Sequence, residues 1–414
     1  MSIRPILSAL LRNKTGAILV ALQVAISLAI MANALHIVSQ RLAIAARPSG
    51  VADESTLLYL NVHHLSKGSH EQQLARQHAE TAALRAVGGV TSAAWISQMP
   101  LSWSGSNTSI ALDRKQNGPS ADDVSFYVSP ESIIDTLGLK LVEGRDFNAG
   151  DIVTVNTATA DTEYPPPTVI ITRSLARKLW PDAASVVGKT LYFGFGASAT
   201  ASRVVGVVDM LQSPNAEVDP RGYLSVISPA RTTFAFDSNY VARVEPGQRE
   251  RVMKEAEQAL RRSSATPVII KTRTVQQDRA ERYRADIALA WMLAAVSLLL
   301  LLVTASGIVG MASLWVTQRR KQIGVRRALG ARKRDILAYF ITENVMITSL
   351  GVAGGVLLAA GLDQLLVARL HMERLPPGYL AAGAAVFWAL GALAAWGPAW
   401  RGAAISPAIA TRSA

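Results

Sequence analysis

Four long stretches without a charged residue constrain the fold of this 414-residue chain more than any other feature. About 20 helical residues cross the hydrocarbon core of a membrane, and each stretch is long enough to do so. Half of the residues are hydrophobic and only 17% are charged, which fits membrane helices combined with a water-exposed domain. The sequence therefore predicts a membrane protein with four transmembrane α-helices. The stretches are residues 16–38, 287–318, 344–362 and 375–400.

Positive charges beside these stretches predict their orientation. Arg4, Arg12 and Lys14 precede the first stretch, and Arg401 and Arg412 follow the fourth. Eight Lys and Arg residues lie between the second and third stretches, before the first acid of that loop. Because Lys and Arg flanks stay in the cytoplasm, we expect both termini and this loop inside, and a large domain outside between the first two helices.

The formal net charge of +12 is concentrated beside the predicted helices, where anionic membrane lipid explains it. No basic stripe interleaved with aromatic residues predicts a nucleic-acid partner. Ala32-Asn33-Ala34 could end a cleaved signal peptide. The apolar run before it is longer than the usual core of such signals, so a retained helix is favoured.

The external segment alternates between strand and helix patterns, which predicts a mixed α/β domain. The Ser- and Pro-rich segments 103–125 and 148–167 are expected to be loops, and Gly194 to Gly196 a hairpin turn. Ser174 is expected to cap a helix, and Val252, Ala256 and Leu260 to share the buried face of another. The expected strands are 56–62, 90–96, 168–172, 204–208, 223–227 and 268–271, and the expected helices 70–87, 174–180 and 248–262.

Residues with catalytic or metal-binding chemistry form no recognisable site. His63, His64, His70 and His78 are close in sequence, but acids at matching spacing are missing, which favours surface histidines over a metal site. The chain has no cysteine, and it lacks the serine-hydrolase, zinc-protease and phosphate-loop motifs. We therefore expect a non-catalytic subunit that binds no cofactor or metal itself.

Three acids lie at the ends of predicted membrane helices: Asp286, Glu343 and Asp363. An acid inside a membrane can belong to a proton or cation relay. Each of these acids is close to an interface, where local pairing is less costly, and a structural role is therefore the favoured interpretation.

Small residues recur at four-residue spacing in two of the helices. Ser306 and Gly310 do so in the second, and Gly351, Gly355 and Ala359 in the third. Such faces allow helices to pack closely in lipid. Packing within one chain is the default interpretation, and packing across a dimer stays open.

Three parts of the sequence resemble one family. They are IGVRRALGARKRDILAYFITENVMITSLGVAGGVLLA (323–359), YVSPESIIDTLGLKLVEGRDF (127–147) with TVIITRSLARKLWPDAASVVGKTLYFG (168–194) and VVGVV (204–208), and PAWRGAAISPAIATRS (398–413). Together they resemble the MacB/FtsX-like permeases, the membrane subunits of mechanotransmissive ABC systems. The resemblance implies a bacterial inner-membrane protein with a MacB-like core domain in the periplasm.

The resemblance also implies a division of the chain. Residues 1–39 would hold the first membrane helix, 40–272 the periplasmic core domain, and 273–318 one continuous helix that serves as stalk and second span. Residues 319–337 would form a cytoplasmic coupling loop, and 338–414 the last two spans.

A coupling helix is expected from Ile323 to Ala331, docking on a cytoplasmic ABC ATPase. Ile323, Ala328 and Leu329 would bury in the ATPase, and the arginines would pair with its acids. The alternative is an amphipathic helix on lipid. The residues assigned to coupling are Ile323, Gly324, Val325, Arg326, Arg327, Ala328, Leu329, Gly330 and Ala331.

MacB carries its ATPase before the first span, where this sequence has only fifteen residues. We therefore expect ATP and Mg to be bound by a separate ATPase chain. A second permease subunit, identical or divergent, is also expected. The resemblance further suggests a periplasmic adaptor and an outer-membrane channel.

The leading functional hypothesis is extrusion of a peptide, lipid-linked compound or antibiotic. The alternative is an FtsX-like transducer that controls an extracytoplasmic enzyme such as a cell-wall hydrolase. A membrane receptor without an ATPase is disfavoured by the coupling loop.

Overall fold

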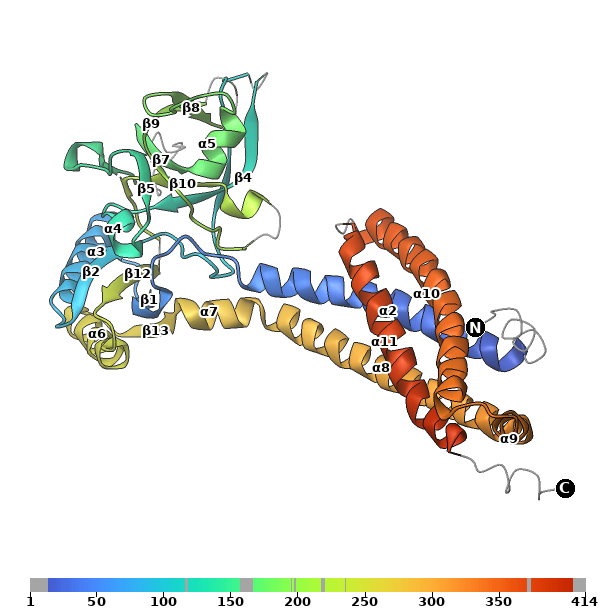
Figure 1. Ribbon diagram of the computed structural model, residues 1–414. Coiled ribbons are helices and arrows are strands. Elements are labelled where there is room, and N and C mark those ends of the chain that lie inside the picture. Colours follow the sequence, from blue (N-terminus) through green and yellow to red (C-terminus); the bar gives the residue numbers. More distant parts are fainter. Residues whose placement is uncertain are drawn as a thin grey trace. The chain divides into compact units, whose positions relative to one another are not determined.

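The computed structural model describes residues 14–115, 118–156, 167–194, 196, 199–216, 220–234, 236–370 and 374–404. The chain divides into two compact units (Figure 1). The helical unit comprises Met1–Ala45 and Ala285–Ala414, and the α/β unit comprises Ala46–Arg284. Arg4, Arg12, Arg412 and the end of the resembling segment 398–413 lie outside the described residues.

The helical unit contains four helices long and apolar enough to cross a membrane. The first is followed by the α/β unit and the other three come after it, which confirms the expected order. Each helix extends beyond its charge-free stretch, because charged residues are tolerated where a helix leaves the hydrocarbon core. The helices are α2 (Lys14–Ala45), α8 (Arg284–Gln318), α10 (Lys333–Leu370) and α11 (Pro377–Ala403).

The expected continuous helix over 273–318 is interrupted. A short helix, α7 (Val275–Arg282), ends at Tyr283, and α8 begins at Arg284. The Tyr283 side chain is buried, and its hydroxyl accepts a hydrogen bond of 3.2 Å from Gln212 Nε2. The prediction of one continuous helix was wrong. Hydropathy and polarity patterns do not reveal that the Tyr283 side chain is buried in the α/β unit at the residue where α7 stops.

One half of the α/β unit is a four-stranded antiparallel sheet with the order β13-β1-β12-β2. Its core lies between the sheet and two helices, α3 and α6, where Leu84 meets Val252, Ala256 and Leu260. The expected buried face of α6 is therefore confirmed. The elements are β1 (Leu57–His64), β2 (Val90–Trp95), β12 (Asp237–Val244), β13 (Val268–Thr274), α3 (His70–Arg85) and α6 (Arg249–Ser263).

The other half is built on a seven-stranded sheet with the order β5-β9-β7-β10-β4-β3-β8. Its core contains the buried side chains of β7 and β9 and of helix α5. The strands are β3 (Asn107–Ala111), β4 (Ser120–Val128), β5 (Leu141–Gly144), β7 (Thr168–Thr172), β8 (Thr190–Phe193), β9 (Thr200–Val208) and β10 (Ser225–Ser228).

Short elements complete this unit. The strands β6 (Val153–Thr154) and β11 (Ala230–Arg231) pair in parallel. The helices are α4 (Ile133–Leu137) and α5 (Arg173–Leu179), with the 3₁₀ turns η1 (Glu54–Thr56), η2 (Ala149–Asp151) and η4 (Pro220–Tyr223).

Several local predictions were wrong. The expected loop 103–125 contains β3 and most of β4, because Ala121 and Val124 are buried while Ser120, Asp122 and Asp123 are exposed. The expected loop 148–167 contains η2 and β6, and 157–166 lie outside the described residues. The strand expected from 223 begins at Ser225, after η4.

Ser174 does not cap α5, because the helix begins one residue earlier. The N-cap is Thr172, whose hydroxyl donates to Tyr223 O at 2.7 Å instead of capping the helix. The expected turn at Gly194 and Gly196 connects β8 with β9, which pair antiparallel, although position 195 lies outside the described residues.

Candidate coupling site

A short helix forms a corner between α8 and α10. This helix, α9 (Arg320–Ala328), begins after Arg319, where the backbone leaves helical geometry at φ −98° and ψ 13°. It ends at Ala328 with Leu329 as its C-cap, and the next residue, Gly330, has φ +96°, a conformation that glycine adopts at low cost. Ala331 N–H donates to Arg326 O at 3.0 Å and closes the last turn. The helix expected from Ile323 to Ala331 thus begins and ends three residues earlier than predicted, because the chain leaves helical geometry before Gly330.

One side of α9 is fastened to its own chain. Ile323 is 4% exposed and packs in a cluster with residues of α8, α10 and α11. Gly324 is buried as well. The expectation that Ile323 would bury in a partner was wrong, because the intrachain cluster already covers it. The cluster comprises Val316, Ile323, Ile336, Phe340, Ala399 and Ala403.

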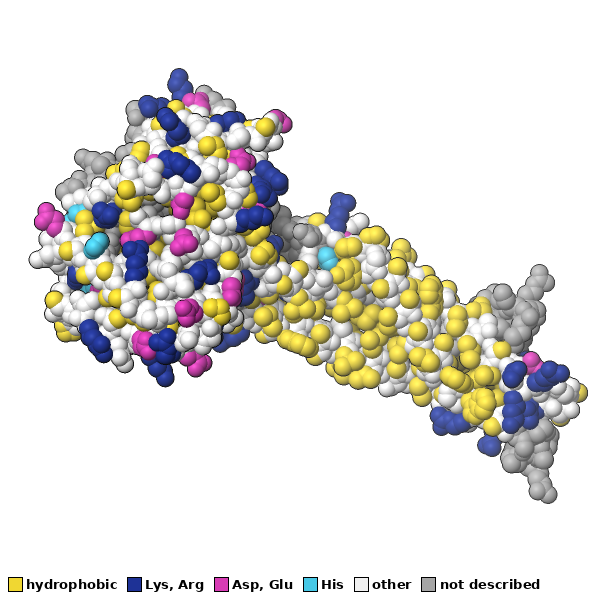
Figure 2. All heavy atoms as spheres, turned by 60° about the vertical axis from the view of Figure 1, so that its left-hand side comes forward, with side chains coloured by type: hydrophobic (Ala, Val, Ile, Leu, Met, Phe, Trp, Pro, Cys, Tyr) yellow, Lys and Arg dark blue, Asp and Glu magenta, His cyan; other side chains and the backbone are white. Residues whose placement is uncertain are grey.

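The opposite side of α9 faces outward. Val325 is 52% exposed and Leu329, which caps the helix, is 82% exposed. Residues four apart lie on the same face of a helix, so these two side chains form one apolar strip, which we call the α9 strip. Arg326, Ala328 and Gly330 are also exposed, and Arg327 is half-buried. Figure 2 shows Lys and Arg side chains gathered at one end of the helical unit, beyond a hydrophobic surface.

A buried ion pair holds the start of α9 to α10. Arg319 Nη1 donates to both carboxylate oxygens of Glu343, at 2.9 and 2.7 Å. The Glu343 side chain is 1% exposed and that of Arg319 16%. The next residue, Asn344, donates from Nδ2 to Gly391 O of α11 at 2.5 Å. This pair, the corner pair below, therefore lies where α8, α9 and α10 meet.

The two other membrane-flanking acids have local partners too. Asp286 accepts a 2.6 Å hydrogen bond from Arg41 of α2. Asp363 accepts the backbone N–H of Leu375 at 2.9 Å. All three acids thus make the local contacts expected of structural residues.

The small residues of α10 lie directly against α2. A Cβ atom at Gly351 would come within 2.7 Å of Ala21 O and of Val24 Cβ, and one at Gly355 within 2.9 Å of Leu28 Cδ2. Ala359 is fully buried, and its carbonyl accepts a long hydrogen bond of 3.4 Å from Asn33. In this structure the third span therefore uses its small residues within one chain.

The small residues expected to pack in α8 do not pack within the described part of the chain. Ser306 and Gly310 are exposed, and a Cβ atom at Gly310 would have no described atom within 4 Å. The glycine in contact is Gly307, where a Cβ atom would come within 2.4 Å of Gln23 Oε1. Spacing in the sequence marks a face of small residues but does not say which face meets a neighbour.

The four histidines do not come together. His63 lies 3.0 Å from Asp237, and His70 contacts Thr233 Oγ1 at 3.2 Å. His78 is exposed. The expectation of surface histidines was wrong for His64, which is 2% exposed because it follows Leu58, Leu60 and Val62 on the inner face of β1. Within the described ranges, no three His, Asp or Glu side chains are placed to hold a metal ion.

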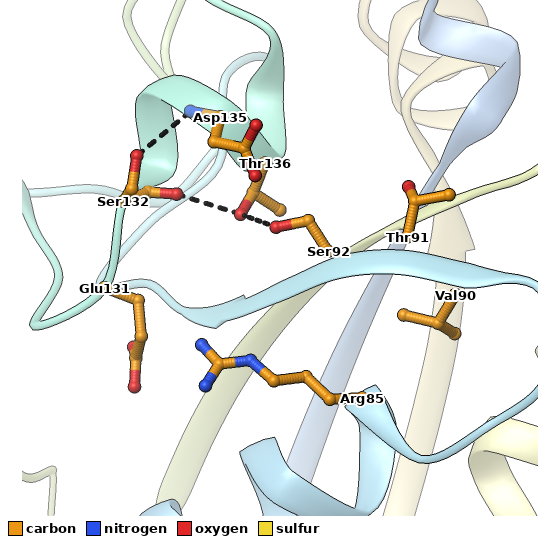
Figure 3. A pocket seen from close by; sticks show the side chains of 8 residues that line it. All are labelled: Arg85, Val90, Thr91, Ser92, Glu131, Ser132, Asp135 and Thr136. Atoms are coloured by element: carbon orange, nitrogen blue, oxygen red, sulfur yellow. Dashed lines mark hydrogen bonds between the residues drawn. The ribbon is translucent and has the colours of Figure 1, made fainter.

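A polar cavity of about 320 Å³ lies between α3, β2 and α4 in the α/β unit (Figure 3). Arg85 Nε and Nη2 donate to Ala93 O at 2.9 and 2.8 Å, and the side chain points toward Glu131. Burial raises the pKa of Glu131, although its carboxylate accepts Trp95 N–H at 3.1 Å. Ser92 and Thr136 hydroxyls bond each other at 2.8 Å. No sequence motif predicts this cavity, because its lining residues come from two separate segments, 85–92 and 131–136.

A second ion pair joins the two ends of the α/β unit that continue into α2 and α8. Arg279 of α7 donates to Glu54 at 3.0 and 2.5 Å, and also to Arg47 O at 2.7 Å. Burial raises the pKa of Glu54, but hydrogen bonds from Arg279 and Ser49 outweigh it and leave the pKa lowered. The entering and leaving segments are thus tied to each other within this unit.

Comparison with known families matches nearly the whole chain. Residues 19–259, more than half of its length, match the MacB-like periplasmic core domain. Residues 294–407 match the FtsX-like permease C-terminal domain. The α9 corner lies inside the second match.

Similar curated proteins include two named "Macrolide export ATP-binding/permease protein MacB". That of Agrobacterium fabrum is 29% identical over 238 residues, covering 55% of this chain and 34% of the relative. That of Chromobacterium violaceum is 28% identical over 276 residues, covering 65% of this chain and 40% of the relative. The pyoverdine export ATP-binding/permease protein PvdT of Pseudomonas syringae is 38% identical over 85 residues, which are 20% of this chain and 13% of the relative. This chain thus spans well under half of the length of these relatives.

Among solved structures, the periplasmic region of MacB from Actinobacillus actinomycetemcomitans aligns with 58% of this chain and 97% of its own. The TM-score is 0.33 and the identity 13%. A domain of a putative permease from Porphyromonas gingivalis aligns with 54% of this chain and 92% of its own, with a TM-score of 0.34 and 15% identity.

Proposed function

Since this chain belongs to the family of permeases with a MacB-like periplasmic core domain and an FtsX-like permease domain, we propose that it is the membrane subunit of an ATP-driven export complex. In this proposal a cytoplasmic ATPase moves the helical unit, and the α/β unit carries the movement to the outer face of a bacterial inner membrane. The permease itself performs no chemistry.

The two-sided helix α9 is the observation that carries this proposal. Its Ile323 side is fixed to α10 and α11, whereas the α9 strip has no cover among the described residues. A leucine that is 82% exposed amid cations suits a site that a partner covers with an apolar groove and an acidic rim. A docking helix needs one side packed on its own chain and another side exposed to the partner. A force that the partner applies to the exposed side of α9 then moves the helices packed on its other side, α10 and α11.

The partner we propose is an ABC ATPase on a separate chain, which binds ATP and Mg. The 414 residues contain no Gly-x-x-x-x-Gly-Lys-[Ser/Thr] phosphate loop. The names of the MacB relatives join ATP-binding and permease functions in one protein. A second permease subunit would complete the complex, and a periplasmic adaptor with an outer-membrane channel would extend it.

The cargo class is proposed from the names of the relatives. Two are named for macrolide export and one for pyoverdine export. We propose a cargo of comparable kind, an antibiotic, a peptide or a lipid-linked compound, released from the outer face of the membrane. Reconstitution of the permease with its ATPase should give ATP hydrolysis that a cargo of this kind stimulates. No stimulation by any of them, with unchanged drug resistance and secretion on deletion, would contradict export and favour the transducer alternative.

The docking assignment is tested by Leu329→Asp. A carboxylate at the centre of an apolar groove must be desolvated without a partner, so ATPase co-purification should be lost. Leu65→Asp makes the same change at a 57% exposed position of the α/β unit and should leave co-purification intact. Both variants should keep the wild-type melting temperature. An unaffected complex with Leu329→Asp would exclude the α9 strip as the docking surface.

A further inference from the structure

The corner pair is an unusual way to fasten two helices. Glu343 is almost fully buried, and a buried carboxylate loses its hydration, which its pairing with Arg319 offsets only in part. Apolar residues of similar size would fasten α8 to α10 at lower cost. A charged pair also fixes the relative orientation of the two side chains, because both carboxylate oxygens of Glu343 accept from the same guanidinium nitrogen of Arg319, at 2.7 and 2.9 Å.

Arg319 stands at the point where the chain bends. Its N–H donates to Trp315 O of α8, and its carbonyl accepts the N–H of Ile323 of α9, each at 3.0 Å. Its own backbone has left helical geometry. A single non-helical residue between two helices is where their angle can change, since few backbone bonds oppose that change. The side chain of this same residue carries the ion pair.

We propose that the corner pair fixes the angle between α8 and α9, so that displacement of the α9 strip moves α8 instead of bending the corner. Arg319 and Glu343 are then positioning residues for coupling, and neither touches ATP, ATPase or cargo. Without the pair, α9 would be held by the Ile323 cluster and by Arg326, whose guanidinium lies 5.1 Å from the ring centre of Tyr339 of α10. The transmission of movement to α8 rests on the proposed function, but the rigidity of the corner can be measured without an ATPase.

The first experiment uses the full chain alone in nanodiscs of phosphatidylethanolamine and phosphatidylglycerol. The chain has no cysteine, so spin labels at Leu314→Cys on α8 and Ala328→Cys on α9 report only the corner distance. Wild type should give one narrow distance distribution. Glu343→Gln should broaden it, and the exchange of Arg319→Glu with Glu343→Arg should narrow it again. An equally narrow distribution in Glu343→Gln would overturn the proposal.

The matched control is Asp286→Asn, which neutralises the acid that pairs with Arg41 at the other end of α8. It should leave the corner distribution unchanged. If Glu343→Gln does not accumulate as a folded chain, Arg319→Gln with Glu343→Gln takes its place. That variant leaves neither charge of the pair and carries the same expectations.

The second experiment uses the permease with its co-purifying ATPase. Glu343→Gln should retain the ATPase and its basal hydrolysis rate, because the α9 strip is intact. Cargo stimulation of hydrolysis should fall by about tenfold, a typical coupling between sites, and return in the exchanged pair. Loss of ATPase binding, or full stimulation, would overturn the role of the pair. Failure of wild type to bind any ATPase would instead contradict the proposed function.

Discussion

The helices α10 and α8 are similar in length but are attached to the helical unit in different ways. Helix α10 brings its backbone against α2 through Gly351 and Gly355, and one third of its most apolar segment is buried (33%). In α8 the corresponding share is 17%. Apart from the buried Ile308 and Trp315, which join an apolar cluster with Val24 of α2, polar side chains attach α8 at separate points. These contacts are Gln23 Nε2 to Val303 O at 3.1 Å, Ser27 Oγ to Thr304 Oγ1 at 2.9 Å and Arg41 to Asp286 at 2.6 Å.

The difference indicates which helices move together. Close backbone packing over two turns fixes α10 on α2, because any sliding drives side chains into backbone. Separate hydrogen bonds can be exchanged one at a time, and in a membrane each is worth only about 0.6 kcal/mol on average. We infer that α2, α10 and α11 move as one body with α9, which is fixed to α10 and α11, and that α8 follows this movement through the corner pair.

The largest expected effect is that of Gly351→Val. Its side chain would overlap the backbone of Ala21, which cannot rotate away, so we expect a loss of about 3 kcal/mol, the upper end for overpacked cores. Thermal unfolding of the full chain in detergent measures it. Gly310→Val makes the same chemical change where no described atom is near, and should cost the isolated chain almost nothing. Equal losses at the two sites would remove the distinction between α10 and α8.

A smaller effect concerns the Glu54–Arg279 pair, which ties α7 to the segment that follows α2. The pKa of Glu54 is lowered in the folded state from an ordinary value of 4.5. Its contribution to stability is therefore full above about pH 5 and is lost as pH falls through the lowered folded-state pKa. The protection of the α7 amides, that is the slowing of their exchange relative to the unfolded chain at the same pH, should fall below pH 4.5 in wild type. In Glu54→Gln the protection should already be lower at pH 7 and should respond less to acid.

Hydropathy predicted the four long helices because the length of a charge-free run reports directly on the solvent around it. Periodicity predicted α6 for a similar reason, since Val252, Ala256 and Leu260 recur at the helical repeat. The alternation of Leu58, Leu60, Val62 and His64 could also have revealed that His64 is buried. The nearness of the four histidines in sequence says nothing about burial, whereas the alternation along the strand does.

The coupling corner was only partly predictable. Its position and cations could be seen in the sequence, but the side of α9 that stays exposed could not. That side depends on Ile336, Phe340 and Ala399 in other helices, which together take up Ile323. The partner of Glu343 was missed for the same reason, because Arg319 lies 24 residues away, between α8 and α9.

Replacement of Ser27 by alanine tests a single polar attachment of α8. Thr304 keeps a hydrogen bond of 2.8 Å to Leu300 O in its own helix, so no buried hydroxyl is left without a partner. We expect a loss of about 0.6 kcal/mol, the average for such bonds between membrane helices. Ser306→Ala removes a hydroxyl that, among the described residues, bonds Leu302 O of its own helix; it is the matched control, with no expected change. A loss near 3 kcal/mol for Ser27→Ala would mean that α8 is held as firmly as α10.

The smallest effect is expected for Asp286→Asn, which weakens the outermost attachment of α8. The Arg41 side chain is 36% exposed, so water and salt already screen the pair, and such pairs contribute about 0–1 kcal/mol. Thermal unfolding at low ionic strength should show a small loss, and at 1 M salt, where screening acts within about 3 Å, the loss should disappear. A salt-independent loss of several kcal/mol would show that this pair behaves like a buried one. In that case both ends of α8 would be fixed, and movement could not pass through the helix without breaking an ion pair at each end.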